Sequence, residues 1–371
     1  TVVSSPFHYH LRLLPERILE VQQILEQTSR DPRPYEEQEA FFKYMGDPLI
    51  PILPGDNADI LSSRIWALHD RFASLLPTDM KHTFETAMRD KQIVSLKEVF
   101  NDLTTAVEGA IINMHQSDLR TNIKALDEVL DLFDQIASNR VEVIDRPLFF
   151  EWNIWRGLAI LNYGNVTPNF KMDSGGVPIS LSPAGMPDIQ AEYEGFRLVI
   201  DVTTAFGATQ YNMEGEPVFR HVGSVQRKAR DNGDHRPVYG LFIANRLTPT
   251  VVTDFFARHR ISTHEFAGPV SIVPLSVAEF RNMLVAAKNR GTWGSRELQR
   301  FFEILRLVAL LAPDERTWHE QVQIVASNWL DSRLDLELSL LEALLADIAK
   351  RNREVFDQGQ QSWQLWEPDK G

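Results

Sequence analysis

The segment GMPDIQAEYEGFRLVIDVTT, residues 185–204, holds two aspartates, Asp188 and Asp201, in positions where they could do chemistry together. Apolar and polar residues alternate on both sides of Glu194-Gly195, as they do in two strands joined by a tight turn. In the resulting hairpin Asp188 lies opposite Asp201. Opposed side chains in a sheet are roughly 5 Å apart, where two negative charges repel each other. A hard divalent cation such as Mg²⁺, which prefers oxygen ligands, is the usual reason for such a pair.

The same register makes further predictions about the hairpin. On the polar face Glu192 lies opposite Arg197, which is a favourable charge pair. On the apolar face the opposed pairs are Tyr193 with Phe196, Ala191 with Leu198, and Ile189 with Ile200.

Three more residues could join the aspartates. Glu151 lies in FFEWNIWRGL on the apolar edge of a predicted helix, where a buried carboxylate needs a partner. Glu214 and His221 lie in MEGEPVFRHV, just ahead of SVQRKARDN, which we interpret as the start of a helix. Glu216 competes with Glu214 for the same role. The surrounding segment is basic, and its members are Arg220, Arg227, Lys228 and Arg230.

Helices are predicted before this region and mixed α/β structure within it. Residues 1–145 hold few glycines, and Ile60, Ile65, Leu68 and Phe72 recur at helical spacing. Residues 118–136 are expected to form one amphipathic helix. From Phe149 onward the pattern is mixed. Two continuous apolar runs there are typical of strands buried on both faces, and each precedes a helical pattern: 238–245 before 248–260, and 270–276 before 277–290.

Composition limits the class of protein. The 371 residues can bury a large core in more than one domain, and no apolar run reaches the ~18 residues of a membrane helix. There are no cysteines and no basic-then-apolar leader, which fits a cytoplasmic protein. The net charge of −13 disfavours a general nucleic-acid coat, although local basic patches can still contact phosphate.

The arrangement resembles the PD-(D/E)XK nucleases and, more closely, the cleavage domain of the AlwI-type restriction and nicking endonucleases. In that family a helix supplies a glutamate, Pro-Asp opens a strand, and a Glu-Val-Thr-like triplet, a glutamate and an Arg-His pair follow. The matching residues are Glu151, Pro187-Asp188, Asp201-Val202-Thr203, Glu214 and Arg220-His221. The resemblance is strong over residues 146–310 and weaker over the front helices, where LLPERILEVQQIL and PLIPILPGD are family-like.

The chain departs from the family pattern at two positions. Asp201 stands where the family usually has glutamate, so its reach toward a metal is one methylene shorter. Thr203 stands where the wider superfamily has lysine, which moves the role of orienting water to His221 and Glu214.

The resemblance implies an α/β PD-(D/E)XK core with a mixed sheet, preceded by a helical region (1–145) and followed by C-terminal helices within 146–371. It implies Mg²⁺-dependent cleavage or nicking of double-stranded DNA of the type IIS kind, with Mn²⁺ as a substitute metal. Asp188, Asp201 and Glu151 would hold the metal, with Glu214 and His221 as catalytic residues. The basic residues Arg220, Arg227, Lys228 and Arg230 would contact the DNA backbone.

Several alternatives stay open. A catalytically inactive nuclease fold that binds DNA or another protein is the main alternative, and a hydrolase of another substrate is a further one. Nothing before residue 146 has a DNA-reading signature, so one interpretation is a cleavage portion without its recognition domain. A transient dimer or a second cleavage subunit is a possible partner. The residues Arg227, Lys228 and Arg230, and a second basic run of Lys288, Arg290, Arg296 and Arg300, are equally compatible with solvated helix faces.

Overall fold

The computed structural model describes residues 46–47, 50–51, 57–78, 80, 84–85, 88–89, 92–137, 145–161, 164–183, 185–290 and 294–364. Contacts divide the chain into two compact units, residues 1–121 with 170–181, and residues 122–169 with 182–371. The family-like segment LLPERILEVQQIL lies outside the described residues. The predicted domain boundary near residue 146 stays a prediction.

The first unit contains two packed helices, α3 (Ala58–Phe72) and α5 (Ile93–Thr121). The predicted apolar stripe of α3 buries Ile65, Leu68 and Phe72, and Leu61 is buried in place of Ile60, which is half-buried. Two short hairpins complete the described part of this unit: β1 (Gly46–Asp47) with β2 (Ile50–Pro51), and β4 (Lys171–Met172) with β5 (Pro178–Ser180).

The second unit is built around a five-stranded mixed sheet in the order β3-β6-β7-β8-β9. The strands β3 and β6 at one side of the sheet are antiparallel to their neighbours, whereas β7, β8 and β9 run parallel to one another. The expected α/β class with a mixed sheet is therefore confirmed. The bounds are β3 (Asn165–Pro168), β6 (Ile189–Glu192), β7 (Arg197–Thr203), β8 (Val238–Ala244) and β9 (Ser271–Ser276).

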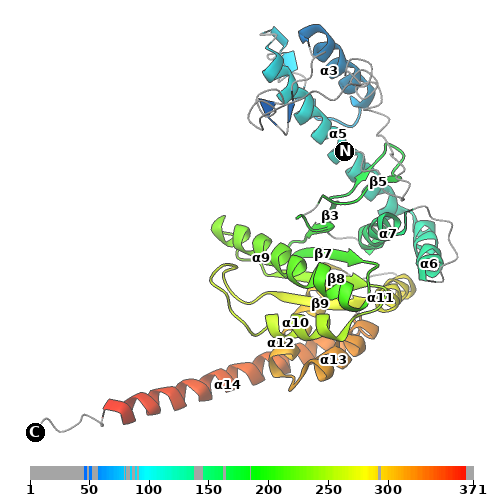
Figure 1. Ribbon diagram of the computed structural model, residues 1–371. Helices are drawn as coiled ribbons and strands as arrows, with labels where there is room; N and C mark the ends of the chain where they lie inside the picture. The colour runs from blue at the N-terminus through cyan, green and yellow to red at the C-terminus, as the bar shows by residue number, and fades with distance from the viewer. Residues whose placement is uncertain are drawn as a thin grey trace, which may run out of the picture. The chain divides into compact units, whose positions relative to one another are not determined.

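Helices precede, connect and follow these strands. They are α6 (Ile123–Ala137), α7 (Arg146–Leu161), α8 (Gly207–Gln210), the π-helical turn η2 (Tyr211–Gly215), α9 (Glu216–Asp231), α10 (Pro249–Arg258), α11 (Val277–Arg290), α12 (Ser295–Leu311), α13 (Glu315–Ser327) and α14 (Arg333–Gln364). In Figure 1, α9 lies along β7 and β8, and it contacts all three parallel strands. The helix α7, which precedes the sheet in the sequence, packs on β3 and β7.

The buried strands follow the sequence prediction closely. Every residue of β8 is buried, and β9 is buried as far as Leu275, because helices cover both faces of the parallel strands. The helices α10 and α11 follow them as predicted. The helix predicted over residues 118–136 is wrong in one respect: α5 ends at Thr121 and α6 begins at Ile123. Asn122 causes the break, since its side chain accepts a hydrogen bond from the Lys124 backbone N–H at 3.1 Å, as residues at helix starts do.

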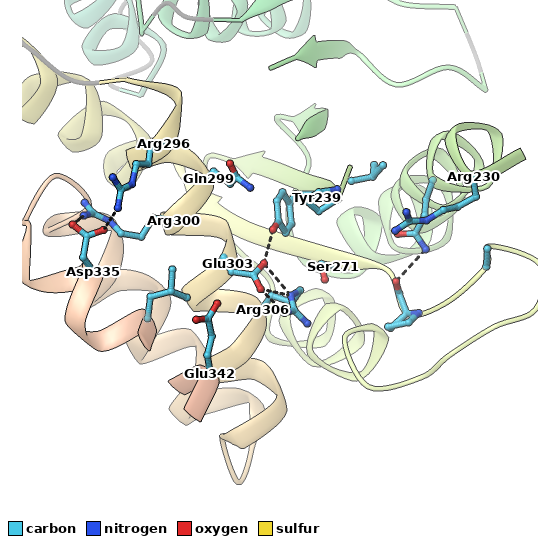
Figure 2. Close-up of a pocket in the computed structure, with 16 residues that line it drawn as sticks. Arg230, Tyr239, Ser271, Arg296, Gln299, Arg300, Glu303, Arg306, Asp335 and Glu342 are labelled. Carbon is cyan, nitrogen blue, oxygen red and sulfur yellow. Dashed lines mark hydrogen bonds and ion pairs between the residues drawn. The ribbon is translucent and has the colours of Figure 1, made fainter. Parts of the chain in front are cut away.

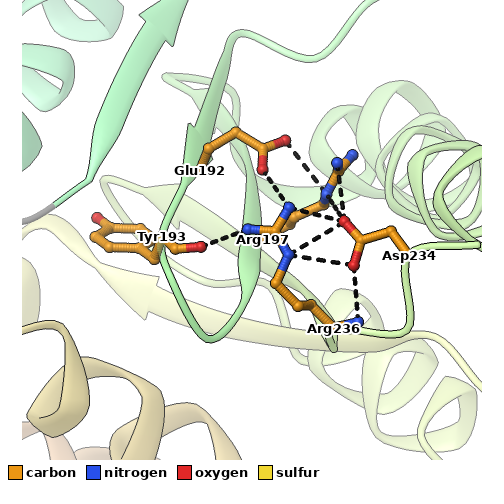
Figure 3. Close-up of polar contacts among 5 residues, drawn as sticks. All are labelled: Glu192, Tyr193, Arg197, Asp234 and Arg236. Carbon is orange, nitrogen blue, oxygen red and sulfur yellow. Dashed lines mark hydrogen bonds and ion pairs between the residues drawn. The ribbon is translucent and has the colours of Figure 1, made fainter.

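The predicted hairpin register is confirmed, with Ile189 opposite Ile200 and Glu192 opposite Arg197. A four-residue ionic network fixes the turn end of this hairpin (Figure 3). Arg197 contacts Glu192 at 3.3 Å and Asp234 at 3.0 Å, and Arg236 contacts Glu192 at 3.0 Å. Arg236 lowers the pKa of Asp234 through hydrogen bonds and charge. The network ties β6 and β7 to the segment that enters β8, which leaves the other end of the hairpin for the site.

None of the helices in the described part of the chain is both long and apolar enough to cross a bilayer.

Candidate active site

The hairpin places the two aspartates side by side. Carried one residue past β6, the register sets Asp188 opposite Asp201. Oδ2 of Asp188 accepts a hydrogen bond of 2.7 Å from the backbone N–H of Val202, the residue after Asp201. This bond fixes the direction of the Asp188 carboxylate at the edge of β7.

Asp201 is almost completely buried, and its two carboxylate oxygens have different surroundings. Oδ1 lies 2.9 Å from Nδ1 of His221. Oδ2 is buried and has no hydrogen-bond partner among the described residues. A buried oxygen without a partner is uncommon, and it indicates a missing ion or donor.

His221 lies in the second turn of α9. The sequence placed the helix start at Ser224, and that prediction is wrong because α9 begins at Glu216. The earlier start follows from the turn before it: α9 continues directly from η2, with Gly215 already in helical conformation, and Pro217 is tolerated in the first turn of α9. The neighbour of His221, Val222, packs so closely on Gly240 of β8 that a Cβ at Gly240 would come within 2.7 Å of it. This contact fixes the height of His221 over the sheet.

Glu151 lies on the face of α7 that is turned toward the sheet, and only 6% of it is exposed. One turn further, the Trp155 indole N–H donates to the Val166 carbonyl of β3 at 3.0 Å and anchors the helix. The sequence predicts that a buried Glu151 needs a partner, and the structure shows that this partner is Ser182. The backbone N–H and the hydroxyl of Ser182 donate to Oε2 of Glu151 at 3.5 and 3.4 Å. Burial nevertheless raises the pKa of Glu151 to about 7.

Glu214 lies in the π-helical turn η2, a wide turn that occurs often at functional sites. Burial raises its pKa, and a hydrogen bond from Thr203 at the end of β7 partly offsets that rise. The competing residue, Glu216, is exposed and forms an ion pair with Arg220 at 3.1 Å. The geometry therefore favours Glu214 over Glu216 as the acid that faces Asp201.

The four acids influence one another electrostatically. The pKa of Asp188 is well above its ordinary range, first because of burial and then because of the charges of Glu151 and Asp201. Burial also raises the pKa of Asp201, while His221 opposes the rise. The folded chain thus holds several acids where their ionised forms are unfavourable, as occurs at sites built for a cation or for acid–base chemistry.

The donor set fits a hard divalent cation. Carboxylate oxygens are the ligands of such ions, and Oδ2 of Asp201 is the buried oxygen that lacks a partner. Among the described residues, however, no three histidine or acidic side chains already converge in the arrangement of a metal-bound centre. The acids are near enough to raise one another's pKa, and Asp188, Asp201 and Glu151 are the group that a cation would draw together.

The basic residues singled out in the sequence do not form one surface. Arg220 pairs with Glu216, and Arg227 pairs with Asp231 at 3.0 Å. Lys228 is exposed. Arg230 lies nine residues beyond His221, which is about 14 Å along the helix. It lines a pocket of about 630 Å³ at the amino ends of β8 and β9, the opposite end of the parallel strands from Thr203 (Figure 2).

Each residue of the second basic run has an ion-pair or hydrogen-bond partner within the chain. Lys288 pairs with Asp127, and Arg290 donates to the Leu330 carbonyl. Asp335 of α14 pairs with both remaining members, Arg300 at 3.0 Å and Arg296 at 3.7 Å. These contacts favour a structural role for the second basic run over a role in DNA binding. Most of the charged residues that line the pocket of Figure 2 are paired with one another, so the acids beside Asp201 remain the stronger candidate site.

Sequence reasoning missed Ser182 and Gln210. Gln210 is fully buried and joins the loop after β7 to the loop after β8. Its amide donates to the carbonyls of Ala205 and Arg246 at 2.9 and 2.8 Å, and it accepts from the Thr248 N–H at 2.8 Å. No local pattern marks either residue, because the partners Glu151, Arg246 and Thr248 lie 31 to 38 positions away in the chain.

Comparison with known proteins adds a family and a distant structure. The family model described as AlwI restriction endonuclease matches residues 8–283. The small subunit, R.BspD6I2, of the heterodimeric restriction endonuclease R.BspD6I is similar in structure, with a TM-score of 0.41 and 24% sequence identity. That similarity covers 57% of this chain and 98% of the subunit. No curated protein sequence matches this chain significantly.

Proposed function

The chain belongs to the AlwI restriction endonuclease family, and from this premise we propose that it hydrolyses phosphodiester bonds of double-stranded DNA with Mg²⁺. The observation that carries the proposal is the Asp201–His221 pair, buried beside three further acids with raised pKa values. A site of this kind is more specific than the family alone, because it supplies both cation ligands and a proton acceptor.

Asp188, Asp201 and Glu151 are the residues that would hold the cation. When bound, a divalent cation supplies Lewis-acid polarisation of the scissile phosphate and favours ionisation of an attacking water. Mn²⁺ is a suitable substitute, since it takes the same oxygen ligands. Asp201 can serve the cation through Oδ2 while Oδ1 stays with His221. Its shorter side chain, compared with the family's glutamate, is sufficient for that role because β7 itself brings the carboxylate to the site.

His221 is the residue we assign to the proton of the attacking water. With Nδ1 donating to Asp201, Nε2 keeps its lone pair, and it has no partner among the described residues. An aspartate on the other ring nitrogen fixes the tautomer and stabilises the protonated ring. Glu214, which accepts a hydrogen bond from Thr203, would add a second carboxylate on the same side of the site.

A catalytically inactive nuclease fold is the second candidate. The observation in its favour is that no three ligands converge among the described residues, together with the aspartate at position 201. In this alternative the acids would bind neither Mg²⁺ nor Mn²⁺ tightly, and the chain would only bind DNA or a partner protein.

The finer features of the function are part of the same proposal. Residues 146–371 would be the cleavage domain of a type IIS-like enzyme, and residues 1–145 a helical region that links it to a separate recognition domain. A second subunit or a transient dimer would cut the other strand. The DNA substrate requires the cytoplasm as its compartment.

Plasmid cleavage tests the proposal. Supercoiled plasmid is incubated with the chain in Mg²⁺, in Ca²⁺ and in EDTA, and the nicked and linear forms are separated on agarose. We expect cleavage in Mg²⁺ only and its loss in Asp201→Asn. DNA binding without cleavage under all conditions would favour the inactive fold, and cleavage by Asp201→Asn at the wild-type rate would exclude the assigned site.

A further inference from the structure

Phe206 is an exposed apolar side chain on the loop that follows β7, the strand that carries Asp201. It follows β7 by three residues, and 75% of it is accessible to solvent, more than any other large apolar side chain among the described residues. A single exposed apolar residue on a protein surface is ordinary. A solvent-exposed aromatic ring just after the strand that carries Asp201 is more informative. Two other exposed apolar residues, Tyr211 and Met213, precede Glu214 in η2.

The loop that carries Phe206 is fixed in place. Gln210 holds the Ala205 carbonyl before it, as described above, and the Thr248 hydroxyl donates to the Gly207 carbonyl after it at 3.3 Å. Gly207 has a φ of +63°, a left-handed conformation that favours glycine. The ring is therefore presented to solvent by a rigid backbone.

A cationic pocket adjoins this ring. Phe206 lines it together with Thr204, Asn245 and Arg246, which follow β7 and β8. The remaining lining residues are Arg146 and Pro147 at the start of α7 and the apolar Ile136 of α6. Its volume of about 470 Å³ falls in the range of roughly 300–1,000 Å³ that small ligands occupy. Arg246 is exposed. One aromatic face and two guanidinium groups match the chemistry of a nucleotide, whose base stacks on rings and whose phosphate pairs with arginine.

The pocket is also in the right place. Thr203, which donates a hydrogen bond to Glu214, is the neighbour of the pocket residue Thr204, and Arg146 begins the helix that carries Glu151. In open α/β sheets, ligands bind at the carboxyl ends of the strands. A nucleotide in this pocket would therefore lie close to the phosphate that the acids act on.

We propose that Phe206 and Arg246 form a subsite for an unstacked nucleotide of the DNA substrate, with the base against the Phe206 ring and the phosphate at Arg246. The inference rests on the proposed function for its substrate class. It goes beyond that function because it predicts that the chain prefers DNA in which one base is free to leave the stack. A mismatched base lacks Watson–Crick pairing, so less free energy is needed to unstack it. A mismatch should therefore favour binding of the base in this subsite.

Fluorescence anisotropy with labelled duplexes tests this in Ca²⁺, so that no cleavage is needed. One duplex is fully paired, and the other carries a single mismatch in otherwise identical sequence. We expect the full chain to bind the mismatched duplex about fivefold more tightly or better, the lower end of what one base–aromatic stack contributes. Phe206→Ala should remove the preference, and Phe206→Trp should keep it.

Two further variants separate the parts of the subsite. Arg246→Ala should weaken both duplexes alike and lower the slope of log affinity against log salt by about one. Met213→Ala, another exposed apolar residue, should bind as the wild type does. No preference in the wild type, or a preference that survives in Phe206→Ala, overturns the subsite while plasmid cleavage in Mg²⁺ stands. Failure to bind or cut any DNA overturns both this inference and the proposed function.

Discussion

At the scale of single residues, Asp201 explains most of the site. One carboxylate oxygen orients His221, and the other is buried without a partner among the described residues. We propose that an aspartate can perform both tasks here because it lies on the central strand β7, whose backbone sets its position. The same burial gives the site its unfavourable electrostatics, which a cation would relieve.

Asp188→Asn tests that electrostatic account. Asparagine keeps an oxygen for the Val202 N–H and removes the charge that faces Asp201 and Glu151. We expect plasmid cleavage to be lost, and the melting temperature in EDTA to stay level or rise by roughly 2–4 °C, the scale of about 1 kcal/mol in a domain of this size. Glu216→Gln is the matched control, because Glu216 is exposed and should leave cleavage unchanged. A clear fall in the melting temperature of Asp188→Asn would show that repulsion between the Asp188 carboxylate and its acidic neighbours does not destabilise the metal-free fold.

Glu151 predicts a pH dependence of stability. Its pKa is raised to about 7 in the folded protein, whereas an unfolded glutamate has a pKa of about 4.3. Between these values the folded state binds more protons than the unfolded state, so the free energy of unfolding falls as pH rises. Its contribution is complete below about pH 4.3 and is lost as pH rises through about 7.

Urea unfolding in EDTA between about pH 5 and pH 8 measures this dependence. We expect Glu151→Gln to reduce the downward slope by up to about 1.4 kcal/mol per pH unit, the limit for one proton. A metal-free wild type whose stability rises over that range would contradict the assigned burial of the acids.

At the scale of elements, the hairpin and α9 deliver the catalytic groups. The hairpin register could be read from the sequence because alternation fixes which side chain faces which, and Asp188 opposite Asp201 follows from it. The start of α9 could not be predicted from the sequence, because α9 follows directly on the π-helical turn η2 and has Pro217 in its first turn. Pairings between distant segments, such as Glu151 with Ser182 and Arg300 with Asp335, also escaped prediction, since no local pattern encodes them.

We expect residues for cleavage and residues for DNA binding to lie at different places along α9. His221 and Lys228 are seven residues apart, so they lie on the same side of α9, whereas Arg230 lies at the pocket at the other end of the sheet. His221→Ala should lower the cleavage rate by ~10²-fold or more and leave DNA affinity in Ca²⁺ unchanged. Lys228→Ala should weaken affinity and reduce its salt slope by about one, and Arg230→Ala should not. Equal loss of affinity in all three variants would show that α9 does not divide these tasks.

At the scale of the whole second unit, a mixed sheet brings together groups from four parts of the chain. The hairpin contributes two members, and the helix α7, η2 and α9 contribute one each, over the parallel strands β7, β8 and β9. The fold class could be predicted because buried parallel strands have continuous apolar sequences. The basic patches could not be interpreted in the same way, because charge alone does not distinguish a DNA contact from a surface ion pair within the chain such as Lys288 with Asp127.

The central claim is that these acids form a divalent-cation site, and calorimetric titration of the metal-free chain with Mn²⁺ tests it most directly. We expect a saturable binding event in the wild type and in Glu216→Gln. The affinity should fall by tenfold or more in Asp188→Asn and in Asp201→Asn, because each removes a charged ligand. Absence of Mn²⁺ binding in the wild type, or unchanged binding in both asparagine variants, would contradict the account.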